Sequence, residues 1–233
     1  MPGEAAIKDT AGSLWMQKPM PVLSEPQISQ LGDHHPLVQQ LGSAEGLYEL
    51  AKASQLLRGA PVTDIGSLRS FLYAYQSQIL MPVELNIIHR SYLHAIHHRT
   101  QELIELDAHV SSIEVIQDFL PASRRVGQNE LRRLRPLRDV RVLQRYLTAV
   151  DEGHAQGWHT CVFGMTLAVY SVPLRQGLLG YAQQVIRGFI HMAGMRFPIC
   201  MGDMDELMED LNGALPTALG GLLFLECLDR QSR

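Results

Sequence analysis

Residues 153–189, GHAQGWHTCVFGMTLAVYSVPLRQGLLGYAQQVIRGF, constrain the fold more than any other stretch, because so much apolar surface has to be buried. The pattern predicts two helices that meet at Val172-Pro173, since a proline cannot continue a helix. The first helix carries small residues at spacings of three or four, which share one face: Gly157, Cys161, Gly164 and Ala168. The second helix carries a stripe of larger residues: Leu174, Leu178, Tyr181, Val185 and Phe189.

We expect the small face to lie against the large stripe, so that the two helices form a tightly packed hairpin shaped by His159, Gly164, Ala168 and Pro173. An interface between two copies of the chain would use a small-residue face in the same way, and the pattern leaves both arrangements open. His159 stands at the start of the first helix, and we expect it to be hydrogen-bonded in the interior or at such an interface.

The remainder of the chain is also predicted to be helical, because few segments alternate in the manner of strands. Apolar spacing and helix breakers predict three helices in the first half of the chain: over 43–57, from a cap at Thr63 or Asp64 to Tyr75, and from Pro82 to about Arg99. Further helices are predicted over 101–108, through Ile116 and past Pro121, and over 137–150. After Pro198, a short acidic helix is predicted to precede a last apolar segment at 222–228. Ser111 and Glu114 have the spacing of a capping box.

We therefore expect an all-α, single-domain bundle of roughly eight to ten helices over residues 36–233, behind a flexible tail over residues 1–35. The alternative for the tail is that part of it docks on a partner, with Trp15 as the anchor.

Charge and composition argue against several classes of protein. The formal net charge is −4, whereas a dedicated nucleic-acid binder needs a surplus of lysine and arginine. No run of apolar residues reaches the length of about 20 that crosses a bilayer. The three cysteines, Cys161, Cys200 and Cys227, are far apart, which fits reduced thiols better than disulfides or a zinc site. With no signal-peptide pattern at its start, the chain is predicted to be cytoplasmic, with no nucleic-acid or membrane partner.

The common catalytic motifs are absent from the sequence, including the P-loop, G-x-S-x-G and H-E-x-x-H. HRSYLHAIHHRT places His94 and His98 four residues apart, on one side of the predicted helix, as two metal ligands would need. His97 points elsewhere, and no carboxylate or cysteine stands at ligand spacing on that face. Exposed or packing histidines are the simpler interpretation, and a transient nickel or zinc contact is the alternative.

The segment ASRRVGQNELRRLRPLRDVRVLQR, residues 122–145, carries eight arginines. One interpretation is a solvated helix face, on which Glu130 and Asp139 offer surface ion pairs worth at most about 1 kcal/mol each. The other is an electropositive surface for an acidic protein partner, because the guanidinium group binds carboxylates in a bidentate manner. The sequence leaves both interpretations open.

Three motifs, in this order, resemble those of one known family. VTDIGSLRSFLYAY resembles a Thr-Asp-x-x-Ser-Leu start of an aromatic helix, and LPASRRVGQNELRRL is similar to an Ala-Ser-Arg-x-x-Gly segment. HTCVFGMTLAVYSVPLRQGLLGY carries the histidine, glycine, Pro-Leu and tyrosine of the third motif at His159, Gly164, Pro173-Leu174 and Tyr181. On these residues the chain resembles the urease accessory protein UreF family over roughly residues 36–212. It departs from the family pattern at both ends, in PLVQQLGSAEGLYE and LLFLECLDRQSR.

The resemblance implies an all-α homodimer that has no catalytic activity of its own. It implies partners, namely a UreD- or UreH-type accessory protein, a UreG-type GTPase whose activity it modulates, and apo-urease. It also implies that nickel is handled by the assembled complex, with no cofactor bound firmly by this chain. We expect partner contacts at Arg124, Arg125, Arg175 and Tyr181, of which Arg175 stands where the family carries a basic residue after Pro-Leu.

Overall fold

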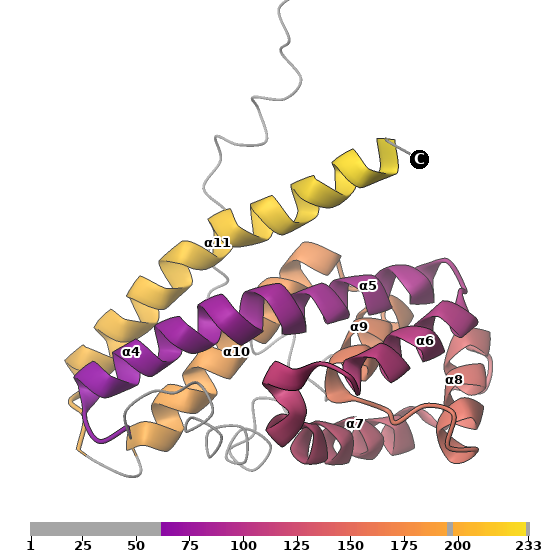
Figure 1. Ribbon diagram of the computed structural model, residues 1–233, viewed down its shortest axis with the longest axis horizontal. Helices are drawn as coiled ribbons and strands as arrows, with labels where there is room; N and C mark the ends of the chain where they lie inside the picture. Colours follow the sequence, from indigo (N-terminus) through magenta and orange to yellow (C-terminus); the bar gives the residue numbers. More distant parts are fainter. Residues whose placement is uncertain (1–61, 195–197, 232–233) are drawn as a thin grey trace, which may run out of the picture.

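The structure is a computed structural model that describes residues 62–194 and 198–231 (Figure 1). The described residues form helices joined by short connections, with no strand among them, and this confirms the all-α class. The predicted tail over residues 1–35 and the predicted helix over residues 43–57 lie outside the described residues. Within the described ranges, no helix combines the length and the apolar character that a membrane crossing needs.

One long helical rod forms the first part of the described chain: α4 (Ile65–Tyr75), the π-helical segment η2 (Gln76–Glu84) and α5 (Leu85–Ile96) follow one another without a break (Figure 1). Of the two caps predicted for its start, Thr63 and Asp64, the structure uses Asp64. The Asp64 carboxylate accepts a hydrogen bond from the Ser67 backbone N–H at 2.8 Å, and the Asp64 N–H donates to Ser67 Oγ at 3.1 Å.

Pro82 does not start a new helix, contrary to the prediction, because it lies inside η2. The hydrogen bonds of a π-helix join residues five apart, and the wider turn accommodates a proline that has no N–H to donate. The predicted end of the third helix near Arg99 is also wrong, since α5 ends at Ile96.

The chain then forms α6 (Thr100–Val110), the 3-10 segment η3 (Glu114–Phe119), α7 (Leu120–Leu134) and α8 (Arg141–Asp151). The predicted capping box at Ser111 is wrong, because Ser111 ends α6 and η3 begins after Ile113 without a side-chain cap. The Ser111 hydroxyl instead accepts a hydrogen bond from Nε1 of Trp158 at 3.3 Å. A contact between segments distant in the sequence therefore replaces the local one.

Helix α9 (His159–Val169) is the centre of the fold, and α10 (Leu174–Gly194) follows it after the predicted turn at Pro173. Every side chain of α9 from His159 to Leu167 is buried. Neighbours on all sides explain why this helix is apolar around its whole circumference. Its first expected small residue, Gly157, lies in the connection before the helix, with φ +74°.

The small face of α9 lies against α5, and the predicted packing against the α10 stripe is wrong. A Cβ built on Gly164 would come within 2.3 Å of the Ile88 carbonyl oxygen. At the same contact, the Ser91 hydroxyl donates a hydrogen bond to the Cys161 carbonyl at 2.5 Å. The missing side chain of Gly164 therefore allows a helix far away in the sequence, not the adjacent one, to approach α9.

Phe189, at the far end of the large stripe of α10, packs on the first rod instead. The ring centroid of Phe189 lies 5.2 Å from that of Phe71 and 4.8 Å from that of Tyr75, both in α4. Offset and edge-to-face ring pairs at these distances add to the stabilisation from burial. This end of the stripe thus fastens α10 to α4.

The last helix, α11 (Met201–Gln231), runs along α4 and α10, and its second half extends beyond them (Figure 1). The sequence predicted a short acidic helix and a separate apolar segment, but the helix continues through Pro216. Four fully buried leucines recur every four residues along it: Leu207, Leu211, Leu215 and Leu219. Burying each leucine stabilises the helix by about 1.5–3 kcal/mol, and together they outweigh the cost of about 3 kcal/mol for an internal proline.

The contact between α9 and α5 yields a stability prediction. We expect Gly164→Ala to lower the free energy of unfolding by roughly 1–3 kcal/mol, because its methyl group would overlap the Ile88 carbonyl. In α11, Gly213 has nothing within 4 Å of a built Cβ, so Gly213→Ala should raise the free energy of unfolding by about 0.5–1 kcal/mol. Denaturant unfolding of both variants measures the difference, and a Gly164→Ala protein as stable as the wild type would contradict this packing.

Candidate functional site

A buried carboxylate holds the connection that leads into α9. Asp107, in α6, accepts hydrogen bonds from the backbone N–H groups of Gln156, Gly157 and Trp158 at 2.6, 3.1 and 3.2 Å. The Tyr146 hydroxyl donates to the same carboxylate at 2.6 Å. Burial raises the pKa of Asp107, and these four donors oppose that effect. The connection is thereby fixed where α9 begins.

The first residue of α9, His159, is bonded on both sides of its ring. Its Nδ1 lies 2.5 Å from Ser123 Oγ of α7, and its Nε2 lies 2.8 Å from the Tyr181 hydroxyl of α10. The His159 backbone N–H also donates to Ser123 Oγ, at 3.2 Å. Burial lowers the pKa of His159 to about 4, so the ring is neutral at pH 7, with one nitrogen donating and the other accepting.

The same tyrosine connects His159 to a second buried acid. Glu84, in η2, is hydrogen-bonded by Tyr181 and accepts from the Tyr75 hydroxyl at 2.8 Å. Burial raises the pKa of Glu84 to about 7, although the two tyrosine hydroxyls oppose the shift. We call the series Ser123, His159, Tyr181, Glu84 and Tyr75 the buried polar chain. Its members come from α7, α9, α10, η2 and α4.

The donors of the buried polar chain have one consistent direction once Glu84 is ionised. The carboxylate can only accept, so Tyr75 and Tyr181 both donate to it. The Tyr181 oxygen then accepts from Nε2–H of His159, and Nδ1 accepts from the Ser123 hydroxyl. Every polar side chain of the series is paired in this arrangement, which is the condition for such a network to stabilise a core.

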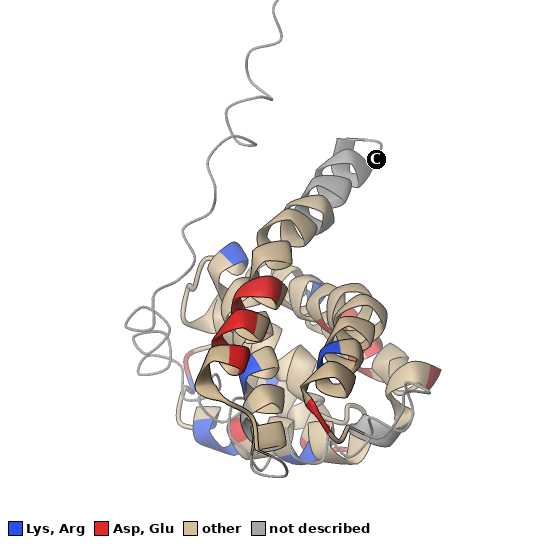
Figure 2. Ribbon diagram, turned by 90° about the vertical axis from the view of Figure 1, so that its left-hand side faces the viewer, with Lys and Arg blue, Asp and Glu red and all other residues tan. Residues whose placement is uncertain are grey.

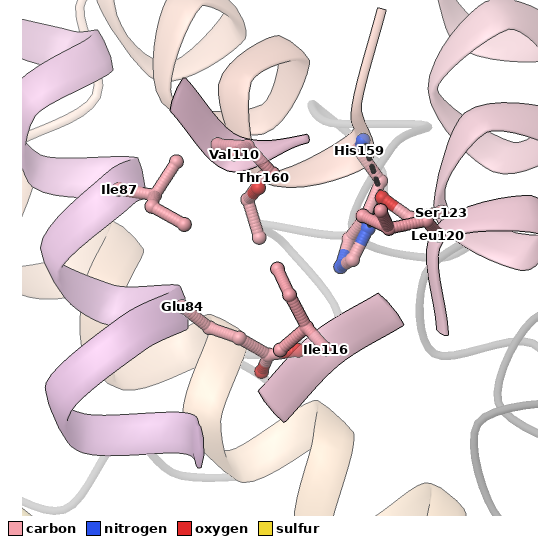
Figure 3. Close-up of a pocket in the computed structure, with 8 residues that line it drawn as sticks. All are labelled: Glu84, Ile87, Val110, Ile116, Leu120, Ser123, His159 and Thr160. Atoms are coloured by element: carbon pink, nitrogen blue, oxygen red, sulfur yellow. Dashed lines mark hydrogen bonds between the residues drawn. The ribbon is translucent and has the colours of Figure 1, made fainter. Parts of the chain in front are cut away.

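A small cavity lies beside the buried polar chain (Figure 3). Its volume is about 10 Å³, which is close to the space for one water molecule. Glu84, Ser123, His159 and Thr160 line it together with apolar side chains from α5, α6, η3 and α7. The cavity is too small for an organic substrate, so this arrangement can orient helices and hold a proton but has no room for a reaction.

The predicted contact residues lie at two separate places. Arg124 and Arg125 are exposed in α7, next to Ser123, which touches the start of α9. Arg175 is exposed at the second position of α10, beside the end of α9. Since an eleven-residue helix is about 16 Å long, the structure does not bring these arginines together. The exposure that a contact requires is present at all three, and their role stays a prediction.

Tyr181, predicted as a contact residue, lies in the core with only 1 % of its surface exposed. Its ring packs at 5.0 Å from that of Phe163, and its hydroxyl belongs to the buried polar chain. The side chain therefore cannot touch a partner in this structure, and the expectation of a contact is wrong. Of the residues expected to shape the hairpin, Gly164 is buried, Ala168 is half-buried and Pro173 is exposed in the turn.

The histidine pair at the end of α5 does not form the predicted arrangement. His97 is the C-terminal cap of the helix, and His98 follows in a left-handed conformation with φ 54°. The spacing of four between His94 and His98 therefore no longer places both rings on one helix face. Among the described residues, no group of three or more His, Cys, Asp or Glu side chains lies together so that it could hold a metal ion.

Sequence reasoning missed the two buried acids. Glu84 stands four residues after Leu80 and four before Ile88, both buried, and Asp107 stands next to the buried Leu106 on the apolar face of α6. A carboxylate on the apolar face of a helix was the available signal, because a buried acid needs hydrogen-bond donors from elsewhere. The donors came from segments far away in the sequence and could not be identified from it.

A family model described as UreF matches residues 62–199, more than half of the chain. The matched residues contain α4 to α10 and all five members of the buried polar chain. No curated protein matches the chain.

Glu84 and His159 predict an unusual pH dependence of stability. The pKa of Glu84 is about 7 in the folded protein, against an ordinary value of 4.5. Between pH 4.5 and 7 the Glu84 carboxyl is therefore more protonated in the folded state than in the unfolded state, so its contribution to the free energy of unfolding falls as pH rises. The pKa of His159 is about 4 in the folded protein, against an ordinary value of 6.5. Between pH 4 and 6.5 the His159 ring is therefore more protonated in the unfolded state, so its contribution to the free energy of unfolding rises with pH. The two effects oppose each other between pH 4.5 and 6.5.

We therefore expect Glu84→Gln to gain stability relative to the wild type as pH rises over this window, by up to about 1.4 kcal/mol per pH unit. Urea unfolding of both proteins at several pH values between 4.5 and 6.5 tests this. Parallel curves for the two proteins would show that Glu84 does not hold its proton in the folded state.

Proposed function

Because the chain belongs to the UreF family, and so has a general role as a urease accessory protein, we propose that it is an adaptor in the assembly of the urease metal centre. In this proposal it bridges a UreD- or UreH-type accessory protein and a UreG-type GTPase to apo-urease. Nickel is the cargo of the assembled complex. The chain performs no chemistry itself, acts in the cytoplasm as a homodimer, and modulates the GTPase through contact.

The observation that carries this proposal is the UreF match over residues 62–199. The geometry of the centre is consistent with an adaptor, because the buried polar chain surrounds a space for about one water molecule. Its side chains are used to join five elements rather than to meet a ligand. A protein with such a core presents a fixed outer surface, which is what binding several partners in one orientation requires.

The alternative function, a histidine-bearing metal-binding or small-ligand protein, has less support. It needs His94 and His98 on one face of a helix, and α5 ends between them. His94 is half-buried, and burial followed by the charge of Arg90 lowers its pKa. No specific observation among the described residues favours this function.

A reconstitution experiment tests the adaptor proposal. The full chain carries an affinity tag and is mixed with the UreD-type protein, the UreG-type protein and apo-urease from the same source, singly and together. We expect the accessory proteins to be retained, and we expect urease assembled without this chain to contain little nickel by metal analysis. Retention of none of the three proteins, or full nickel loading in the absence of the chain, would refute the proposal.

Arg175 supplies a sharper prediction for the same complex. We expect Arg175→Glu to weaken binding of the UreG-type GTPase by about tenfold, which corresponds to about 1.4 kcal/mol. The residue is exposed at the start of α10, so the thermal unfolding midpoint should stay within a few degrees of the wild type. Arg90→Glu, an equal charge change at an exposed position of α5, is the control. Equal affinities of the Arg175 variant and the wild type would remove Arg175 from the interface.

A further inference from the structure

The largest concentration of positive charge in the described chain lies on α7, α8 and the turn between them. Between residues 124 and 145 there are eight arginines and two acids, a formal charge of +6 in a chain whose total is −4. We call these arginines the arginine surface, and the structure places all of them in exposed positions: Arg124, Arg125, Arg132, Arg133, Arg135, Arg138, Arg141 and Arg145. One of the two acids, Glu130, is buried.

The backbone beneath the arginine surface is held rigidly. Gly127 of α7 lies so close to the connection before α9 that a Cβ would stand 2.0 Å from the Gly157 carbonyl oxygen. Gly157 adopts a left-handed φ of +74°, which favours glycine, and its N–H is bound by the Asp107 carboxylate. Gln128 extends the contact, with its Nε2 donating to the Gln156 carbonyl at 3.2 Å. The position of α7 is therefore fixed from its inner side, and so are the backbone positions from which its arginines extend.

The arginines differ in their local partners. Arg135 pairs with Asp151 at 2.5 Å, Arg132 donates to Asn129 at 2.8 Å, and Arg133 lies 3.7 Å from Glu130. Arg124, Arg138, Arg141 and Arg145 pair with no carboxylate of the described chain. On a surface that is this crowded with like charge, the four guanidinium groups gain most from carboxylates supplied by another molecule.

A cleft accompanies these charges. It lies between α7 and α8, has a volume of about 300 Å³, and is lined by the charged Arg132, Arg135 and Asp151 together with the apolar Leu131, Leu147 and Val150. A lining that combines apolar side chains with arginine suits a protein side chain that has both an apolar stem and an acidic end, as glutamate does.

We propose that the arginine surface, with the cleft beside it, is the docking site for an acidic segment of a partner protein. The charge distribution of the molecule favours a protein over a nucleic acid. Figure 2 shows acidic residues along the first half of α11, on the side turned away from α8. These acids and the net charge of −4 repel an extended phosphate backbone. A short acidic segment, in contrast, contacts only the arginine surface.

This inference goes beyond the adaptor proposal, since it states the chemistry of a partner and the surface that the partner uses. Each exposed ion pair contributes at most about 1 kcal/mol, so binding at this site depends on several pairs at once. It should therefore form rapidly and weaken steeply as the salt concentration rises. The test below needs no urease protein, so its failure can be told apart from failure of the adaptor proposal.

The test compares two double variants of the full chain that change the net charge equally. Arg141→Glu with Arg145→Glu alters the arginine surface, and Arg90→Glu with Arg99→Glu alters exposed arginines in and just after α5. The probe is a fluorescein-labelled peptide of about ten glutamates, followed by fluorescence anisotropy at about 50 mM and about 200 mM salt, because these ionic strengths differ in screening. We expect the first variant to bind at least about tenfold more weakly than the wild type and the second to stay within about twofold.

Two further measurements complete the test. Arg141→Gln with Arg145→Gln, which removes the charge without reversing it, should bind with intermediate affinity. Equal loss in both charge-reversed variants, or no binding of the peptide by the wild type at low salt, would overturn the proposal. A uridine oligonucleotide of the same length that binds more tightly than the peptide, and is lost in the Arg141 and Arg145 variant, would assign the surface to nucleic acid instead.

Discussion

The close approach of α9 to α5 and of α7 to the connection before α9 is the constraint on which the rest of the structure depends. At both contacts a glycine faces a backbone carbonyl, Gly164 facing Ile88 and Gly127 facing Gly157, at distances that no side chain could occupy. Backbones this close leave little room between the helices, so the side chains around α9 must interlock. These two contacts set how closely α5 and α7 approach α9 and the connection before it.

The buried polar chain exists because the helices meet at such short range. His159 can reach Ser123 and Tyr181 together only when α7 and α10 both lie next to the start of α9. Tyr181 then brings Glu84 into the same network, so that α4, η2, α7, α9 and α10 are joined by paired polar groups in an apolar core. A paired network of this kind penalises alternative packings, since any shift leaves a buried donor or acceptor without its partner.

This architecture separates the interior from the surface in a way that suits an accessory protein of the UreF family. Glu84 and His159, whose pKa values burial shifts, are used inside the protein. The arginines at both ends of α9 and on α8 are exposed. Because the core fixes α7 and α10 relative to α9, surface groups on these helices keep a constant spacing. Constant spacing lowers the ordering cost of binding partners at separate places.

Much of the local structure could be predicted from the sequence by itself. Residue types and their spacing within one helix predict the helical class, a cap at Thr63 or Asp64, the turn at Pro173 and the small face around Gly164. A hydrogen-bonded His159 was predicted as well, either in the interior or at an interface, and the structure places it in the interior.

Only the tertiary structure decided which helix covers which face. The small face packs against α5 rather than α10, and Tyr181 lies in the core. Helix α11 continues through Pro216 because its leucines pack against α4 and α10. The spacing of residues determines what shares a face, but the neighbour that covers the face depends on all other helices competing for it. For the same reason the hydrogen-bond donors of Glu84 and Asp107 came from distant segments, and these acids became part of the core only through long-range packing.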